Sequence, residues 1–330
     1  MPKLTVATPQ ILLPVAGYRT SSHIIRFRSD DNPQADSTLI EISQGGNVVY
    51  TGSAAAGVSW HTLPGGSVGN FSVRARNIKS GVHSAYSSAV SFTIEDYASA
   101  TQVYNQNYAA ASGCGDSTEP FGVRFFFCSA DAHWSVLCSG WASGGGNMWT
   151  CDTADALGVN NSGSGLYSAN NGIYTQSSAN EGSITGTGYL QNSSGTNDGL
   201  SMSCRDANDG QNNHYAMWLY PNRDAASADN LVLVRHDNTN TNTTLATGRF
   251  AELQNKGAGM GNAVTLRFDC LGSHITAYYQ TAGSFKPMLS VSDSTFPGNP
   301  AFSFMALGVG PGGVTQLHTR MTMLTIKKYP

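Results

Sequence analysis

The stretch AVTLRFDCLGSHITAYYQ, residues 263–280, carries the clearest strand pattern in the larger part of this chain. Val264, Leu266 and Phe268 alternate with polar residues, which is the period of a β-strand and not of a helix. Turn residues at 270–273 (Cys-Leu-Gly-Ser) then precede a second run with the same period. The pattern therefore predicts a β-hairpin.

Further alternating runs extend this pattern along the chain. Residues 214–220 form one that ends at Pro221-Asn222, and residues 230–235 form the next. In the first hundred residues, turn clusters separate four runs: 23–28, 38–43, 71–76 and 87–94. None of these runs has a helical period, so the predicted fold class is all-β, with packed sheets as in a sandwich.

A change of composition near Glu95 divides the chain into two modules. All six cysteines lie after it, and no lysine occurs between Lys79 and Lys256. A chain of 330 residues also exceeds the usual size of one hydrophobic core. We therefore predict a small sandwich at 1–96, a connector at 97–113 and a larger sandwich at 114–330.

Charge and hydropathy exclude several classes of protein. Charged residues make up 12% and hydrophobic residues 40% of the chain, which argues against disorder. The formal net charge is -3 and no run of Lys or Arg precedes Lys327-Lys328, so a nucleic-acid footprint is missing. No apolar run of signal-peptide length follows Met1, and none reaches about eighteen residues. We expect synthesis in a cytoplasm and no membrane insertion.

The alternation also assigns side chains to two faces of each sheet. The predicted inner set is Val264, Leu266, Phe268, Ile275, Ala277, Tyr279, Tyr215, Met217 and Leu219. The predicted outer set is His214, Trp218, Tyr220, Arg267 and Tyr278, with His274 as a further candidate. Such a face can stack sugar rings and hydrogen-bond their hydroxyls, or it can form a subunit interface. A third interpretation places Trp218 in the core and reverses the assignment.

The six cysteines show no CxxC spacing, which argues against a structural zinc site. We favour free buried thiols. One or two disulfides among Cys114, Cys128, Cys138 and Cys151 are the alternative if the product ends up outside a cell.

Residues 9–94 resemble a fibronectin type III domain. The likeness is carried by Pro9 and Pro14, by Phe-Ser-Val-Arg-Ala-Arg at 71–76 and by residues 84–94. Phe71 stands where the family usually has Tyr, and Phe27 where it has Trp. The resemblance implies a spacer or docking role.

The segment Gly-Gly-Ser-Val-Gly at 65–69 fits a hydrolase nucleophile elbow, but a strand and not a helix follows, so we predict a loop.

Residues 120–328 resemble the concanavalin-A-like jelly rolls of laminin-G domains, lectins and glucanases. Three elements carry the likeness: Arg205-Asp206 with Asn213-His214-Tyr215, Val264-Thr265-Leu266 with Gly272-Ser273-His274-Ile275, and Ser292-Asp293-Ser294. The resemblance implies a two-sheet fold. It leaves sugar binding, hydrolysis and a purely structural role open, because one fold hosts many functions.

Catalytic residues are not visible. Glycanases of this fold need two nearby carboxylates, and the five glutamates (Glu41, Glu95, Glu119, Glu181 and Glu252) form no E-x-D-x-E cluster. No phosphate-binding loop, dinucleotide fingerprint or zinc motif occurs. The segment Asp-Ala-Asn-Asp-Gly at 206–210 lacks EF-hand spacing, so we favour an Asx turn there, with calcium binding as the alternative. We expect no enzyme, no cofactor and no metal.

The chain resembles tailed-bacteriophage virion proteins in three respects. It has two modules, its second module is rich in Gly, Ser, Asn and Thr, and lysine is scarce. This resemblance implies a structural protein on the virion exterior, made in the bacterial host cytoplasm. The expected partners are other virion proteins or a host-surface carbohydrate, which a tail fibre or tip protein would bind. A homo-oligomer is expected, and trimers are usual for fibres. The alternatives are a decoration protein of capsid or tail without a ligand, and a secreted bacterial carbohydrate-binding or glycanase-like protein.

Overall fold

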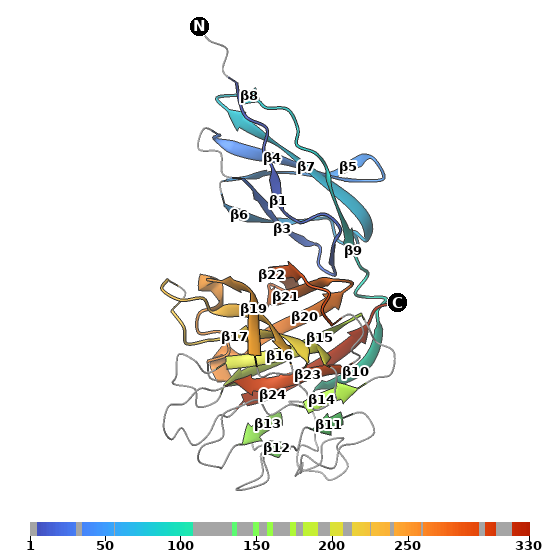
Figure 1. The fold of residues 1–330 in the computed structure, drawn as a ribbon, viewed down its shortest axis with the longest axis vertical. Coiled ribbons are helices and arrows are strands. Elements are labelled where there is room, and N and C mark those ends of the chain that lie inside the picture. The colour runs from blue at the N-terminus through green and yellow to red at the C-terminus, as the bar shows by residue number, and fades with distance from the viewer. Residues whose placement is uncertain are drawn as a thin grey trace. The chain divides into compact units, whose positions relative to one another are not determined.

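The computed structural model describes these residues: 5–30, 35–55, 57–107, 134–136, 148–151, 157–160, 172–175, 181–190, 199–206, 213–224, 226–237, 241–258, 260–296, 301–307 and 319–330. The chain forms two compact units, Met1–Ser99 with Thr281–Met288 and Ala100–Gln280 with Leu289–Pro330. β-strands make up most of the described residues in both units (Figure 1). No helix in the described ranges is long and apolar enough to cross a membrane. The predicted all-β class is confirmed.

The first unit contains two sheets. The smaller has β1 (Ile11–Leu13), β3 (Ile24–Ser29) and β6 (Val58–Thr62) in the order β1-β3-β6. The larger has β2 (Tyr18–Thr20), β4 (Ser37–Gln44), β5 (Asn47–Ala54), β7 (Gly69–Lys79), β8 (Val82–His83) and β9 (Val90–Ile94). Its order is β2-β9-β7-β4-β5, and β8 pairs with β7. Among the described strands of this sheet, β2 pairs with β9 in parallel, and the pairs β9-β7, β7-β4 and β4-β5 are antiparallel.

One hydrophobic core joins these two sheets. Phe27 of the smaller sheet and Phe71 of the larger are both buried in it, and Phe71 stacks on Phe92 with ring centroids 5.5 Å apart. The two positions that differ from the fibronectin pattern therefore still fill a core. Residues 65–68 of the glycine-rich segment lie between β6 and β7, which begins at Gly69, and Ser67 donates to the carbonyl of Pro64. The predicted loop is confirmed, because no helix follows this serine.

The second unit contains two larger sheets. The eight-stranded sheet has the order β12-β13-β24-β15-β20-β21-β22, and β10 also pairs with β24. Its strands are β10 (Thr101–Asn107), β12 (Met148–Cys151), β13 (Leu157–Asn160), β15 (Gly182–Leu190), β20 (Val264–Leu271), β21 (His274–Thr281), β22 (Ser284–Ser292) and β24 (Thr319–Lys328). The predicted hairpin is β20-β21, and Gly272 in its turn has a φ of 59°.

The seven-stranded sheet has the order β11-β14-β23-β16-β17-β18-β19. Its strands are β11 (Trp134–Val136), β14 (Gly172–Thr175), β16 (Gly199–Asp206), β17 (His214–Leu219), β18 (Leu231–Asp237), β19 (Thr241–Gly248) and β23 (Ala301–Leu307). Two 3-10 turns, η1 (Ala251–Leu253) and η2 (Met260–Asn262), follow β19. A disulfide between Cys204 of β16 and Cys270 of β20 joins the two sheets face to face.

Two expectations differ from this structure. Residues 101–107 fall within the predicted connector, yet they form β10 and pair with β24. Their partner is more than two hundred residues away in the sequence, so local composition does not reveal the pairing. The expectation of free thiols is wrong for Cys204 and Cys270. Cys114, Cys128 and Cys138 lie outside the described residues, as does the side chain of Cys151.

Candidate functional site

The inner faces of the second unit follow the predicted alternation. Cys204 pairs with Tyr215 in register, and Cys270 pairs with Ile275, so the disulfide marks the inner face of each sheet. Tyr215, Met217, Leu219, Leu266 and Phe268 share these faces and are buried. The assignment of the inner set is therefore confirmed for these residues.

The predicted outer set does not form one surface. His214, Trp218 and Tyr220 lie on the outer side of the seven-stranded sheet, whereas Arg267 and Tyr278 lie on the outer side of the eight-stranded sheet. Stacked sheets turn their outer faces in opposite directions. The expectation of one contact face made by all five residues is therefore wrong.

Most of these residues are also buried. The exposed fraction is 3% for His214, 8% for Tyr220, 2% for Arg267 and 1% for Tyr278, and Trp218 is half-buried. His274 is buried as well. Alternation tells which side of a sheet a residue takes, but it does not tell whether that side is covered. The expectation of a solvent-facing surface is wrong for every predicted residue except Trp218.

Trp218 lies in a cluster of aromatic and aliphatic side chains on β17 and β18. It packs against a buried group made of Ala216, Tyr220, Val232 and Val234. The Trp218 and Tyr220 rings meet edge to face with centroids 6.4 Å apart. The Nε1 atom of Trp218 is buried and has no hydrogen-bond partner among the described residues. This buried donor therefore belongs to the packed side of the cluster.

Arg223 completes this cluster. Its guanidinium carbon lies 3.6 Å from the centroid of the Tyr220 ring, and Nη1 donates to the carbonyl of Asp229 at 3.1 Å. Burial raises the pKa of Tyr220, and the positive charge of Arg223 partly offsets that rise. We call Trp218, Tyr220 and Arg223 the indole patch. Sequence reasoning missed Arg223, whose only signal was its place just after the Pro221-Asn222 turn.

His214 stands at the other end of β17. It pairs directly with His236 of β18, and the two imidazole rings stack with centroids 5.0 Å apart and an interplanar angle of 3°. Parallel rings direct their nitrogen lone pairs within their own planes, so this arrangement does not point both rings at one metal ion. No group of three or more possible metal-binding side chains occurs in the part of the chain that the structure describes. Residues 207–210 of the calcium alternative lie outside it.

Arg267 and Tyr278 serve the packing of the other sheet. Arg267 Nε lies 3.4 Å from Asp269 Oδ1, and its guanidinium covers the Tyr278 ring at 4.4 Å from the centroid. All three side chains are almost completely buried. Removing one partner of such a pair leaves a buried charge and costs about 3–5 kcal/mol. We assign these residues to stability and not to ligand contact.

A polar network joins the motif elements that the sequence singled out. Tyr215 donates to Asp293 Oδ1 at 2.5 Å, and Arg235 Nη1 donates to Asp293 Oδ2 at 2.7 Å. Burial and the bond to Asp293 raise the pKa of Tyr215 to about 12. Burial alone would raise the pKa of Asp293, but the bonds from Tyr215 and Thr295 and the charge of Arg235 lower it below its ordinary value.

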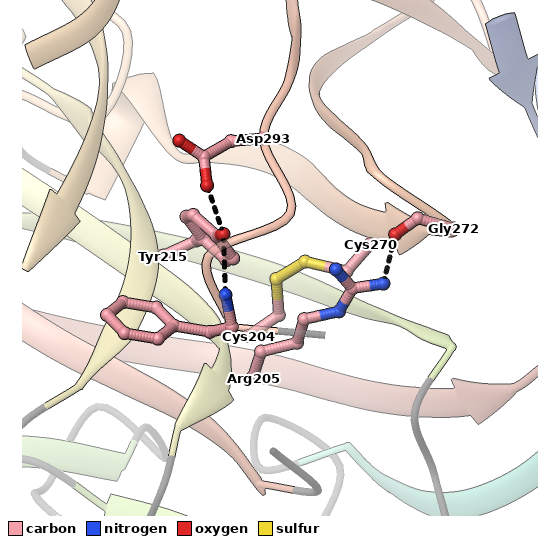
Figure 2. Close-up of a disulfide and its surroundings, with 7 residues drawn as sticks. Cys204, Arg205, Tyr215, Cys270, Gly272 and Asp293 are labelled. Carbon is pink, nitrogen blue, oxygen red and sulfur yellow. Dashed lines mark hydrogen bonds between the residues drawn. A yellow bond between two sulfur atoms is a disulfide. The ribbon is translucent and has the colours of Figure 1, made fainter. Parts of the chain in front are cut away.

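The same end of the sandwich holds the disulfide. Figure 2 shows Cys204 bonded to Cys270, with the neighbouring Arg205 reaching the carbonyl of Gly272 in the β20-β21 turn. The amide of Gly272 in turn donates to Glu181 at 2.9 Å. Arg205, Tyr215 and Asp293 thus connect elements that are distant in sequence. Their role is to fix the two sheets, which explains why three separate motifs meet here.

Two of the other described glutamates, Glu41 and Glu95, accept hydrogen bonds within the first unit. Glu41 accepts from Arg74 and Tyr86, and Glu95 accepts from Arg19 at 2.7 Å. Glu252 lies in η1, and Glu119 is outside the described residues. Because Glu41 and Glu95 belong to the first unit, they do not supply a carboxylate pair on the jelly-roll sheets. A non-enzymatic function stays a proposal.

Comparisons with known proteins find remote structural likeness. No protein-family model matches the sequence, and no curated protein matches it. The carbohydrate-binding module CBM66 from Bacillus subtilis is similar at 12% identity over 59% of this chain and 96% of that chain, with a TM-score of 0.37. A legume lectin-like domain from Entamoeba histolytica shares 10% identity over 52% and 84%, with a TM-score of 0.35. Fibronectin(III)-like modules of Clostridium thermocellum CbhA share 19% identity over 27% and 97%, with a TM-score of 0.22.

Proposed function

We propose that this chain is a non-enzymatic structural protein of a phage virion exterior, and that its second unit binds a host-surface glycan through the indole patch. Trp218 carries the proposal, because among the five predicted contact residues it alone is half-buried and the other four are buried. Arg267 and Tyr278 are left out of the contact, since both are buried on the opposite sheet.

The chemistry of the patch suits a carbohydrate. A sugar ring presents C–H groups that pack on an aromatic surface, and its hydroxyl groups accept and donate hydrogen bonds. The half-buried Trp218 ring offers an aromatic surface of this kind, whereas its Nε1 atom is buried and is not part of the proposed contact. Arg223, held over the Tyr220 ring at 3.6 Å, adds a positive charge beside the indole. The patch thus combines an apolar surface with polar groups.

The exterior location rests on two observations. Disulfides persist in oxidising surroundings and are rare in the cytoplasm, and Cys204 is bonded to Cys270. The lysine-poor sequence with tandem β units resembles virion proteins, as described above. A secreted bacterial carbohydrate-binding protein shares the disulfide argument. Immunogold labelling of purified phage particles separates these two locations, since only a virion protein labels the particle.

The test of binding compares two substitutions at one position. The full chain is screened against bacterial lipopolysaccharide O-antigens and capsular polysaccharides, and the best probe is titrated by calorimetry. Trp218→Ala should weaken binding by about 2 kcal/mol or more, as hot-spot truncations do. Trp218→Phe keeps an aromatic ring for the sugar to pack on, so it should weaken binding less than Trp218→Ala does.

Tyr279→Phe, on the inner face of the opposite sheet, is the matched control and should leave the affinity unchanged. Absence of binding to every probe would favour the decoration protein without a ligand. Binding that survives both Trp218 substitutions would place the glycan site elsewhere and overturn the indole patch. Release of reducing ends from any bound probe would contradict the non-enzymatic assignment.

A further inference from the structure

Strand β5 is an edge of the larger sheet in the first unit, and among the described strands only β4 pairs with it. The outer side of an edge strand offers unpaired backbone N–H and C=O groups. None of the eight residues Asn47–Ala54 is charged or a proline. Charged residues and prolines usually protect an edge strand from pairing with another chain, and β5 has neither.

Most of β5 has regular geometry. A register shift at Val49 marks a bulge against β4, and Tyr50–Ala54 then pair with β4 residue by residue. A bulge disturbs the ladder locally. Five consecutive residues therefore remain in a form that a further strand can join. Thr51 and Ser53 are exposed in this segment.

Two other edge strands in the described part of the chain, β2 and β19, differ from β5. The opposite edge of the same sheet is β2, which has three residues and carries Arg19 in an ion pair with Glu95. Strand β19 ends the seven-stranded sheet and is also uncharged, but it holds no large hydrophobic residue among the exposed ones. Strand β5 carries Val48, whose exposed fraction is 50%. Length, neutrality and an exposed apolar residue coincide at β5.

We propose that β5 pairs with β5 of a second copy of this chain, antiparallel and about a two-fold axis. A register centred on Gly52 sets Tyr50 opposite Ala54, and Thr51 opposite Ser53, of the second copy. This places a large side chain beside a small one and two hydroxyl groups beside each other, both suitable cross-strand pairs. A neutral strand also meets no like charge when it pairs with itself. Such an interface closes as a dimer.

Sedimentation equilibrium of the full chain tests this pairing. The expected result is a monomer–dimer equilibrium that Thr51→Lys and Ser53→Lys each weaken, and that the double variant weakens by about tenfold or more through like charges placed opposite each other. Mixing the Thr51→Lys chain with a Ser53→Glu chain should restore dimers, because opposite charges then face each other. This rescue depends on the proposed register, and circular dichroism checks that each variant is folded.

Two substitutions serve as controls. Val15→Lys changes a residue with an exposed fraction of 45% that lies outside the strands, and Thr244→Lys changes an exposed residue of β19. Both should leave the equilibrium unchanged. A monomer at all concentrations, a trimer, or a dimer that withstands the double substitution would overturn the proposal. The glycan affinity of the Thr51→Lys chain is expected to equal that of the unmodified chain. The β5 dimer and the glycan site can therefore fail independently of each other.

Discussion

The hydroxyl group of Tyr215 donates to Oδ1 of Asp293 at 2.5 Å and thereby ties β17 to the segment that follows β22. The same hydroxyl accepts from the amide of Phe296 at 3.0 Å, while Arg235 holds the other carboxylate oxygen. One tyrosine hydroxyl therefore has both a donor and an acceptor role, and each partner comes from a distant part of the sequence.

Tyr215→Phe should destabilise the second unit by about 2 kcal/mol, because a hydrogen bond to a charged group is lost and the Phe296 amide loses its acceptor. Tyr279→Phe removes a hydroxyl outside this network and should have a smaller effect. Urea unfolding followed by tryptophan fluorescence measures both. Equal effects of the two substitutions would show that the network contributes little.

Asp293 gives the stability of the protein a dependence on acid pH. Its pKa is lowered in the folded state, so its contribution is present above the ordinary pKa of Asp and is lost as the pH falls through the folded value. The free-energy difference between the unmodified chain and Asp293→Asn should therefore shrink as the pH falls below about 4, the ordinary pKa of Asp. A difference that stays constant over this range would contradict the assignment.

The Cys204–Cys270 bond should add stability by restricting the unfolded chain. It closes a loop of 66 residues, for which the chain-entropy model gives about 4 kcal/mol. Replacing both cysteines by alanine should lower the free energy of unfolding by up to about 4 kcal/mol. Peptide mapping of the unmodified chain without reductant should recover the crosslinked peptides. If the double variant unfolds at the same denaturant concentration as the unmodified chain, the bond has no stabilising role.

Any side chain at position 257 would clash with its neighbours and strain the backbone. The φ of Gly257 is +84°, and an added Cβ atom would lie 2.7 Å from Leu200 Cδ1 and 3.3 Å from Val264 Cγ1. Gly283 has a similar φ of +79° but open space around it. Gly257→Ala should therefore cost about 1–3 kcal/mol more than Gly283→Ala, and thermal melting of the two variants measures the difference. Equal losses would mean that Leu200 moves away freely.

Features that depend only on neighbouring residues could be predicted from the amino-acid sequence. The alternation of Val264, Leu266 and Phe268 and the turn glycine Gly272 were enough to predict the β20-β21 hairpin, because strand period and turn chemistry are local. The same reasoning predicted the loop at 65–69 and the inner face of β17. These conclusions needed no knowledge of which strands pair.

Features that depend on contacts between distant segments of the chain are seen only in the tertiary structure. Alternation placed Trp218 and Arg267 on outer faces, but only the stacking of the two sheets shows that these faces point in opposite directions. Burial of Arg267 and the meeting of Cys204 with Cys270 have the same cause, since a covered face and a cross-sheet bond arise from segments far apart in the chain. Sequence period fixes the side of a strand, whereas the packing of sheets fixes what that side meets.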